Sequence, residues 1–230
     1  MTPEGFVFPS GEKLISITKV NGQDTSSGCR TAAYGGGRMS EPIRSFTTAV
    51  PSWRSRVTPL NIEEASGVQL EAMRVTTSST NIGEFTLVLA LDPETLLHLT
   101  PLLNGIMSGP GGLSRSETEL GAVSASVVNR SIYCAAAHSD QYNQLTKDPA
   151  VIDSIFSSGE SADISPRQKA LLEFASKLTK SPSEATKADI EGLFGNGFDM
   201  VEVLDLVFAA SLFGWVNRLS HVLVDPMPRS

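Results

Sequence analysis

The sequence predicts an all-α protein, a helical bundle. Apolar residues recur at the three- and four-residue spacing of buried helix faces from about residue 62 onward. Serine, threonine or aspartate stands before most of these segments, as helix N-caps do. The alternation expected of a half-buried strand is not convincing anywhere. With 230 residues, 40% of them hydrophobic and 19% charged, the chain can remove roughly 70% of its surface from water.

Composition divides the chain into three parts. Residues 1–38 are rich in glycine, serine and threonine without a sustained period, which predicts a disordered tail. Residues 39–61 contain three prolines and predict an extended arm that lies on the domain or on a partner subunit. The all-helical domain is expected over residues 62–230.

The first helices are marked by their start and stop signals. Residues 62–75 form a first helix, made less regular by Gly67. Asp92 followed by Pro93 is an N-cap with proline in the first turn, and the glycine-rich residues 109–112 end the helix that follows.

A second pair of helices follows directly. Ser114 and Glu117 have the spacing of a capping box and open a helix with an apolar stripe. A short break over residues 129–131 precedes a helix over residues 132–145.

The C-terminal half continues the pattern. Helices are expected to open at Asp148-Pro149, Ser165-Pro166 and Thr186, and the last of these stops at residues 195–197. The final long helix is apolar on two sides. One side carries Val201, Leu204, Phe208 and Trp215, and the other carries Val203, Leu206 and Phe213. We expect burial on both sides, and therefore a homo-oligomer.

Charge and hydropathy limit the partners. The net charge is −7 without a basic cluster, which argues against nucleic acid and anionic membranes as main partners. No stretch approaches the roughly 20 uninterrupted apolar residues of a membrane span. The first residues lack the apolar region of a signal peptide, so we expect a cytoplasmic protein.

Cysteine and histidine are scarce. Cys29 and Cys134 lie far apart and do not indicate a disulfide framework. The three histidines are well separated, and no metal-ligand spacing connects them to the cysteines. We therefore expect no metal and no cofactor.

One short stretch carries the groups for thiol chemistry. Cys134 and His138 are four residues apart and share one face of a helix. Cysteine reacts as the thiolate, which a nearby base or a helix N-terminus favours. Glu119, one helix upstream, is placed to orient the imidazole. With Ser131 at the helix start and Tyr133 beside the cysteine, these five residues are the candidate catalytic set.

Each candidate also has a structural interpretation. A lone buried cysteine usually packs as a small hydrophobe, and Ser131 is a normal N-cap residue. Tyr133 either positions a reactant oxygen or only packs. Glu117 is explained by the capping box and is assigned no chemistry, while His98 and His221 are interpreted as packing residues.

The motif residues resemble a known family. The resemblance rests on Leu113-Ser114-Arg115, Glu119, Asn129, Tyr133-Cys134 and His138, with Ser165-Pro166-Arg167 and Val216-Asn217-Arg218-Leu219. Together they resemble the alkylhydroperoxidase D-like, carboxymuconolactone decarboxylase superfamily, in its peroxidase-related branch, over residues 70–225. The resemblance implies an all-helical fold and a dimer, trimer or hexamer.

The resemblance also implies roles for the candidates. Cys134 takes the place of the peroxidatic cysteine, which a hydroperoxide oxidises to a sulfenic acid. Glu119 and His138 take the places of the groups that move protons, and Tyr133 stands where some members have a second histidine. Ser131 stands where the other cysteine of a Cys-x-x-Cys pair belongs, so recycling needs an external thiol or Cys29.

The sequence thus predicts an antioxidant thiol peroxidase that reduces small hydroperoxides through one cysteine. Two alternatives stay open. The first is a decarboxylase- or isomerase-like enzyme that uses Glu119 and His138 as acid and base, without thiol redox chemistry. The second is a non-enzymatic redox sensor whose cysteine only reports oxidation.

Overall fold

The computed structural model describes residues 41–74 and 83–229. The predicted tail, with Cys29, lies outside these residues. The helices of the described part are α1 (Gly67–Arg74), α2 (Glu84–Leu89), α3 (Pro93–Ser108), α4 (Arg115–Val128), α5 (Ile132–Thr146), α6 (Ala150–Ser158), α7 (Pro166–Thr179), α8 (Lys187–Gly195) and α9 (Met200–Leu223). Two short 3₁₀ helices, η1 (Ile62–Glu64) and η2 (Gly159–Ser161), complete the helical elements, so the predicted all-α fold is confirmed.

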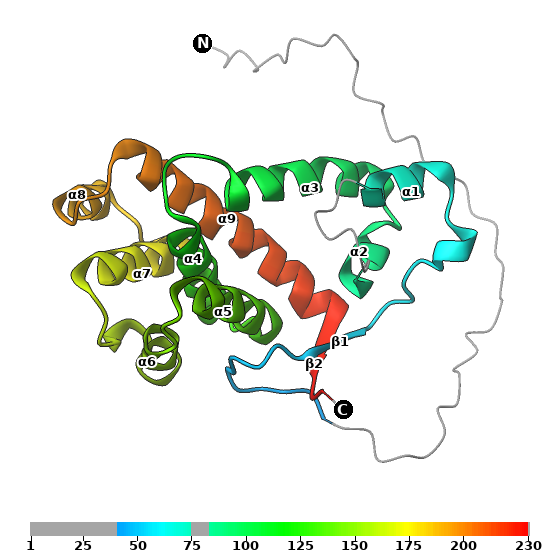
Figure 1. The fold of residues 1–230 in the computed structure, drawn as a ribbon, viewed down its shortest axis with the longest axis horizontal. Coiled ribbons are helices and arrows are strands. Elements are labelled where there is room, and N and C mark those ends of the chain that lie inside the picture. The colour runs from blue at the N-terminus through cyan, green and yellow to red at the C-terminus, as the bar shows by residue number, and fades with distance from the viewer. Residues whose placement is uncertain (1–40, 75–82, 230) are drawn as a thin grey trace, which may run out of the picture. The chain divides into compact units, whose positions relative to one another are not determined.

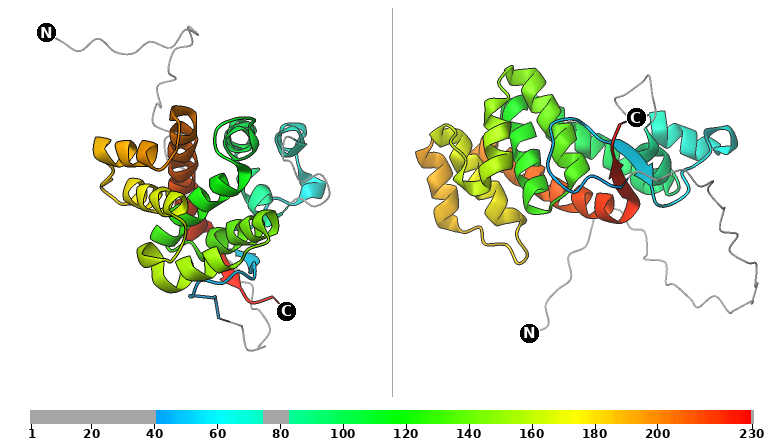
Figure 2. Two further views of the ribbon diagram at one scale, coloured as in Figure 1. Left: turned by 60° about the vertical axis from the view of Figure 1, so that its left-hand side comes forward. Right: turned by 90° about the horizontal axis from the view of Figure 1, so that it is seen from below.

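Helix α9 is the central element of this bundle. It packs against α4, α7 and α3, and the residues that it buries include Leu206 and Phe213. Helices α7 and α8 lie on one side of it, and α1 and α3 lie on the other (Figure 1 and Figure 2). Helices α4 and α5 are joined by only three residues and pack along one another. This α4–α5 hairpin carries all five candidate catalytic residues.

The capping signals at Asp92, Ser114 and Ser165 are confirmed. The Asp92 side chain accepts a hydrogen bond from the Thr95 amide at 3.2 Å at the start of α3. Ser114 and Glu117 form a complete capping box at the start of α4, and so do Ser165 and Gln168 at the start of α7. These caps satisfy amide groups that have no partner inside the helix, and each typically contributes about 1 kcal/mol.

The prediction of one helix over residues 62–75 is wrong in detail. The chain forms η1, leaves the helix at Ala65, and starts α1 at Gly67. The Ser66 amide donates to Gln69 Oε1 at 2.9 Å and the Ser66 hydroxyl accepts from the Gln69 amide, which is the pattern of a capping box. Gly67 therefore begins a helix instead of interrupting one.

The structure also contains a small sheet that the sequence does not predict. Strand β1 (Ser52–Ser55) pairs antiparallel with β2 (Val224–Met227), with Ser52 opposite Met227. Each strand has four residues and β2 contains Pro226, so neither shows a readable alternation. The pairing places part of the predicted arm against the end of α9 (Figure 1).

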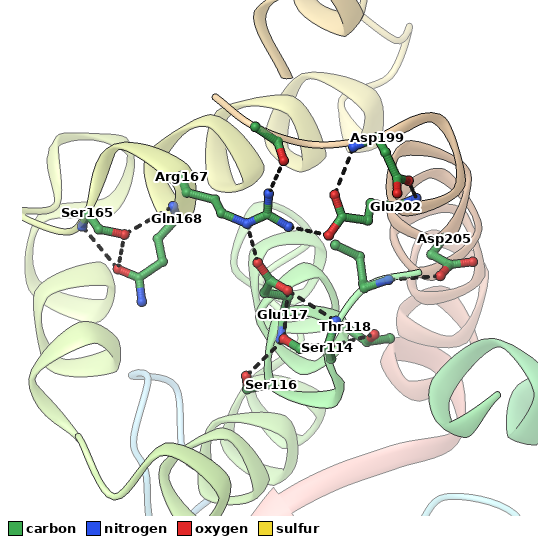
Figure 3. A network of polar contacts seen from close by, with 12 residues as sticks. Ser114, Ser116, Glu117, Thr118, Ser165, Arg167, Gln168, Asp199, Glu202 and Asp205 are labelled. Carbon is green, nitrogen blue, oxygen red and sulfur yellow. Dashed lines mark hydrogen bonds and ion pairs between the residues drawn. The ribbon is translucent and has the colours of Figure 1, made fainter. Parts of the chain in front are cut away.

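The starts of α4, α7 and α9 are joined by one arginine (Figure 3). Arg167 donates from Nε to Glu117 Oε1 and from a terminal nitrogen to Glu202 Oε1, both at 2.6 Å. Its guanidinium also lies 3.8 Å from the centre of the Phe198 ring. Glu117 thus has a structural role in addition to the cap.

Helix α9 is buried on one side within the single chain and exposed on the other. Among the described residues, it is the helix long and apolar enough to cross a membrane by composition alone. Its ten buried residues, however, face the neighbouring helices of the bundle. On the other side Leu204, Phe208 and Trp215 are exposed in the single chain, because α3, α4 and α7 cover only part of the circumference.

Candidate active site

A buried carboxylate and an imidazole form the centre of the site. Glu119 on α4 is fully buried, and its Oε2 lies 2.5 Å from Nδ1 of His138 on α5. The imidazole packs edge-to-face against Phe213 of α9, with ring centroids 4.3 Å apart. Because Nδ1 is held by the carboxylate, Nε2 is the ring nitrogen left to exchange a proton with a reactant.

Arg115 is the second partner of this carboxylate. It stands one helical turn before Glu119 and forms an ion pair with Glu119 Oε1. It also donates to the backbone carbonyl of Met107 and, at 2.7 Å, to the Ser108 hydroxyl. A buried carboxylate needs such compensation, since an unpaired buried charge is strongly destabilising. The four-residue spacing of Arg115 and Glu119 was the available sequence signal for this contact.

Cys134 lies in an apolar setting close to two hydroxyls. Its residue is 5% exposed and belongs to a cluster with Leu99 and Leu212. Its Sγ is 3.4 Å from the hydroxyl oxygen of Ser220 on α9. Burial raises the pKa of the Cys134 thiol, and hydrogen bonds from the hydroxyls of Ser131 and Ser220 act in the opposite direction.

The thiol and the imidazole share a helix face but are not directly bonded. Among the described residues, no hydrogen bond connects Cys134 Sγ to His138. Phe213 belongs to the apolar cluster of Cys134, and its ring packs against His138. The structure therefore brings Glu119 and His138 into contact and places Cys134 one turn away, beside serine hydroxyls.

Ser131 stands at the N-cap position of α5 but does not cap it. It is buried, and its side chain forms no capping hydrogen bond with the first turn. The backbone carbonyl of Ser131 accepts from the Ala135 amide at 2.9 Å, which starts the helix. The hydroxyl acts on the Cys134 thiol instead, so the purely capping interpretation of Ser131 is wrong.

Tyr133 contacts the predicted arm rather than the Glu119–His138 pair. Its ring packs edge-to-face on Trp53 of β1, with centroids 5.0 Å apart. Burial raises the pKa of Tyr133, the nearby Cys134 adds to this, and the charge of Arg229 opposes it. The tyrosine is therefore a neutral hydroxyl at ordinary pH.

The remaining histidines have simple environments. His98 is mostly exposed and lies 3.3 Å from Glu94, so its interpretation as a packing residue among leucines is wrong. His221 Nε2 lies 2.6 Å from the Asn129 carbonyl oxygen and connects α9 to the end of α4. Within residues 41–74 and 83–229, no group of three or more histidine, cysteine or acidic residues is arranged to hold a metal ion.

Known proteins resemble this chain both in sequence and in structure. Residues 93–177, which include α4 and α5, match the sequence model of the Carboxymuconolactone decarboxylase family. One similar crystal structure is that of an alkylhydroperoxidase AhpD core, a peroxidase-related protein from Ralstonia eutropha JMP134. Its sequence is 28% identical and its TM-score is 0.66. The match covers 75% of this chain and 92% of that one.

Over residues 93–177 this chain is similar to the alkylhydroperoxidase D-like, carboxymuconolactone decarboxylase superfamily. A peroxidase-related protein from Silicibacter sp. TM1040 is 25% identical with a TM-score of 0.62, over 84% of this chain and 96% of that one. The debrominase Bmp8 shares the fold at 16% identity with a TM-score of 0.63, over 77% of this chain and 94% of that one. None of the curated proteins searched matches the chain significantly.

Two contacts at this site were not predicted from the sequence. They are the ion pair of Arg115 with Glu119 and the approach of Ser220 to Cys134. Ser220 is 86 residues from Cys134 in the sequence, and a serine on an apolar helix carries no signal for such a contact. Ser126 and Asn217 add a third polar contact, since the Ser126 hydroxyl lies 3.2 Å from Asn217 Oδ1 between α4 and α9.

Proposed function

We propose that the protein is a one-cysteine thiol peroxidase. The observation that carries the proposal is the position of Cys134, beside two hydroxyls and one helical turn from an imidazole that a buried carboxylate orients. The peroxidase-related relatives support the same class of reaction.

In the first step the Cys134 thiolate attacks the distal oxygen of a hydroperoxide. The O–O bond breaks, Cys134 becomes a sulfenic acid, and the leaving alkoxide takes up a proton and departs as an alcohol. His138 supplies that proton through Nε2, while Glu119 stabilises the ring through Nδ1. The hydroxyls of Ser131 and Ser220 stabilise the thiolate by hydrogen bonds.

In the second step a small thiol reduces the enzyme. The thiol attacks the sulfenic acid, a mixed disulfide forms and water leaves. A second thiol then releases Cys134 and carries away the disulfide. Ser131 cannot form an internal disulfide with Cys134, so the reductant comes from outside the α4–α5 hairpin.

The test is peroxide consumption with dihydrolipoamide, glutathione or a thioredoxin system as reductant. The Cys134→Ser variant is expected to lose turnover, and Cys29→Ser, the matched control, to keep it. One equivalent of peroxide consumed without turnover, with every reductant, would favour the redox sensor instead.

A second candidate has its own support in the geometry. The Glu119–His138 pair is complete without the thiol, as an acid–base catalyst would need. For such an enzyme, His138→Asn would abolish activity on a carboxymuconolactone-type substrate while Cys134→Ser kept it. Loss of activity in both variants, or no activity on that substrate, excludes this candidate.

A further inference from the structure

A cavity of about 380 Å³ lies between the predicted arm, the start of α5 and the end of α9. Ser131 and Tyr133 at the start of α5 line it, and so does Ser220 of α9. The Ser220 hydroxyl is also 3.4 Å from Cys134 Sγ, so Ser220 is a neighbour of both the cavity and the thiol. The size is in the range of small-molecule sites.

The cavity is positively charged in a chain whose net charge is −7. Its lining contains three arginines, Arg44, Arg56 and Arg130, and one acidic residue, Asp225. Asp225 is already engaged, since its two oxygens accept from Arg56 at 2.7 Å and from Arg54 at 2.9 Å. In the described part of the chain, Arg44 and Arg130 form no ion pair. Two positive charges are thus uncompensated at the cavity.

The start of α5 adds to this preference for an anion. The helix has 15 residues, its first turn has no side-chain cap, and its first residues line the cavity. Free amide groups and the helix dipole at such an end favour a negative group. The arginines and the helix start come from separate parts of the sequence and face the same space.

We propose that this cavity binds the carboxylate of the small thiol that reduces oxidised Cys134. The inference rests on the proposed peroxidase function and names the class of its reductant. Arg44 and Arg130 bind the carboxylate, which holds the thiol sulfur near Cys134. The thiol attacks the Cys134 sulfenic sulfur, the S–S bond of a mixed disulfide forms, and the hydroxyl leaves as water with the proton of the thiol.

The reductant is a better occupant of this cavity than the peroxide. Formation of the mixed disulfide and its resolution both need a thiol held beside Cys134, and a charged anchor raises the local concentration of that thiol. A cavity of this volume holds a small molecule and is too small for a protein surface.

The test compares two dithiols that differ only in charge. Dihydrolipoate carries a carboxylate, and dihydrolipoamide carries a neutral amide in its place. With the full-length Cys29→Ser protein and one fixed hydroperoxide, we expect kcat/KM for dihydrolipoate to exceed that for dihydrolipoamide by about tenfold at low salt. The ratio is expected to approach one in Arg44→Met and Arg130→Met. The matched control is Arg74→Met, which replaces an exposed arginine of α1 and should keep the wild-type ratio of about ten.

The two half-reactions are measured separately. Oxidation of Cys134 is followed by stopped-flow and by trapping the sulfenic acid with dimedone, without any reductant. The arginine variants are expected to oxidise at the wild-type rate. Equal rates with both dithiols would overturn the carboxylate site but leave the proposed peroxidase function unaffected. Slower oxidation in the arginine variants would mean that the arginines bind the peroxide, which would also overturn the carboxylate site. Failure of Cys134 to oxidise would instead contradict the proposed peroxidase function.

Discussion

Glu119 Oε2 lies 2.5 Å from Nδ1 of His138, and the same carboxylate is paired on its other oxygen with Arg115. One fully buried carboxylate thus connects a cation of α4 to an imidazole of α5. The arginine compensates the charge that would otherwise be costly to bury, and the imidazole gains a fixed orientation. We regard Arg115 and Glu119 as positioning residues and His138 as the group that reaches the reactants.

Replacing the carboxylate by an amide should separate these roles. Glu119→Gln keeps the volume but removes the charge that orients and stabilises the imidazolium. We expect the rate of Cys134 oxidation to fall about 10²-fold. The control is Glu117→Gln, two residues away on the same helix, which should weaken folding but leave that rate within about twofold. An unchanged rate in Glu119→Gln would contradict the proposed proton transfer through His138.

The Ser220 hydroxyl should set the pH at which Cys134 reacts. It opposes the rise in the thiol pKa that burial causes, so Ser220→Ala should raise the pKa of Cys134 further. At pH 7 less thiolate is present, and alkylation of Cys134 by iodoacetamide should slow by roughly threefold to tenfold. The wild type and the variant should converge above the higher of the two pKa values.

The comparison is made in the Cys29→Ser background, so that only Cys134 reacts. Ser124→Ala is the control, because the Ser124 hydroxyl bonds to the Leu120 carbonyl within α4 and does not touch the thiol. Identical pH profiles for Ser220→Ala and wild type would show that the hydroxyl does not stabilise the thiolate.

A second thiol at position 131 should change how the sulfenic acid is resolved. Ser131 and Cys134 are three residues apart at a helix start, and the Ser131 hydroxyl already acts on the Cys134 thiol. In Ser131→Cys, peroxide is expected to produce a disulfide between the introduced thiol and Cys134, with release of water. Mass spectrometry should find this disulfide and no dimedone adduct, whereas Ser131→Ala should keep the adduct. A persistent adduct in Ser131→Cys would mean that the two sulfurs do not meet.

The sequence was most informative where the signals are local. Asp92, Ser114 and Ser165 were recognised as caps because a cap depends on residues three positions away. The Glu119–His138 contact follows from a motif confined to one helical hairpin. These local rules predicted most of the helices, although not α2, and the contact between Glu119 and His138.

Contacts between distant segments could not be predicted in this way. Ser220 meets Cys134 across 86 positions of sequence, and Arg54 meets Asp225 across 171. The strands β1 and β2 are too short to show a period, and their pairing depends on where α9 ends. The cavity beside Cys134 is built from these same distant segments, so no local pattern in the sequence indicates it.

Arg167 should stabilise the fold without affecting the chemistry. It joins Glu117 of α4 to Glu202 of α9, and its side chain is 31% exposed. Arg167→Met leaves two carboxylates without their partner, and we expect the free energy of unfolding to fall by about 1–3 kcal/mol in urea titrations. The exposed Arg74→Met should cost less than about 0.5 kcal/mol. A similar loss in both variants would contradict a specific role for this network.

The same network should make stability depend on acid pH. Burial favours the neutral form of Glu117, but the hydrogen bonds from Arg167 and Ser114 outweigh it and hold its pKa below the ordinary value of 4.5. This contribution is therefore complete above about pH 4.5 and is lost as the pH falls through the lower pKa of the folded state. Urea titrations between pH 6 and pH 3 should show a shallower acid slope in Glu117→Gln than in wild type. Parallel slopes would contradict the lowered pKa.

The exposed face of α9 leads to a prediction about assembly. Phe208 and Trp215 line an apolar groove of about 620 Å³ between α9 and α3, and both are more than 40% exposed. Large adjacent apolar side chains on a monomer surface are typical of interaction sites, so we expect the chain to form homo-oligomers through this face.

Light scattering after size exclusion should give a mass above one chain for wild type and the mass of one chain for Phe208→Glu and Trp215→Glu. Val68→Glu, at an even more exposed apolar residue on α1, should leave the assembly intact. A wild-type protein that is monomeric at all concentrations would contradict assembly through this face.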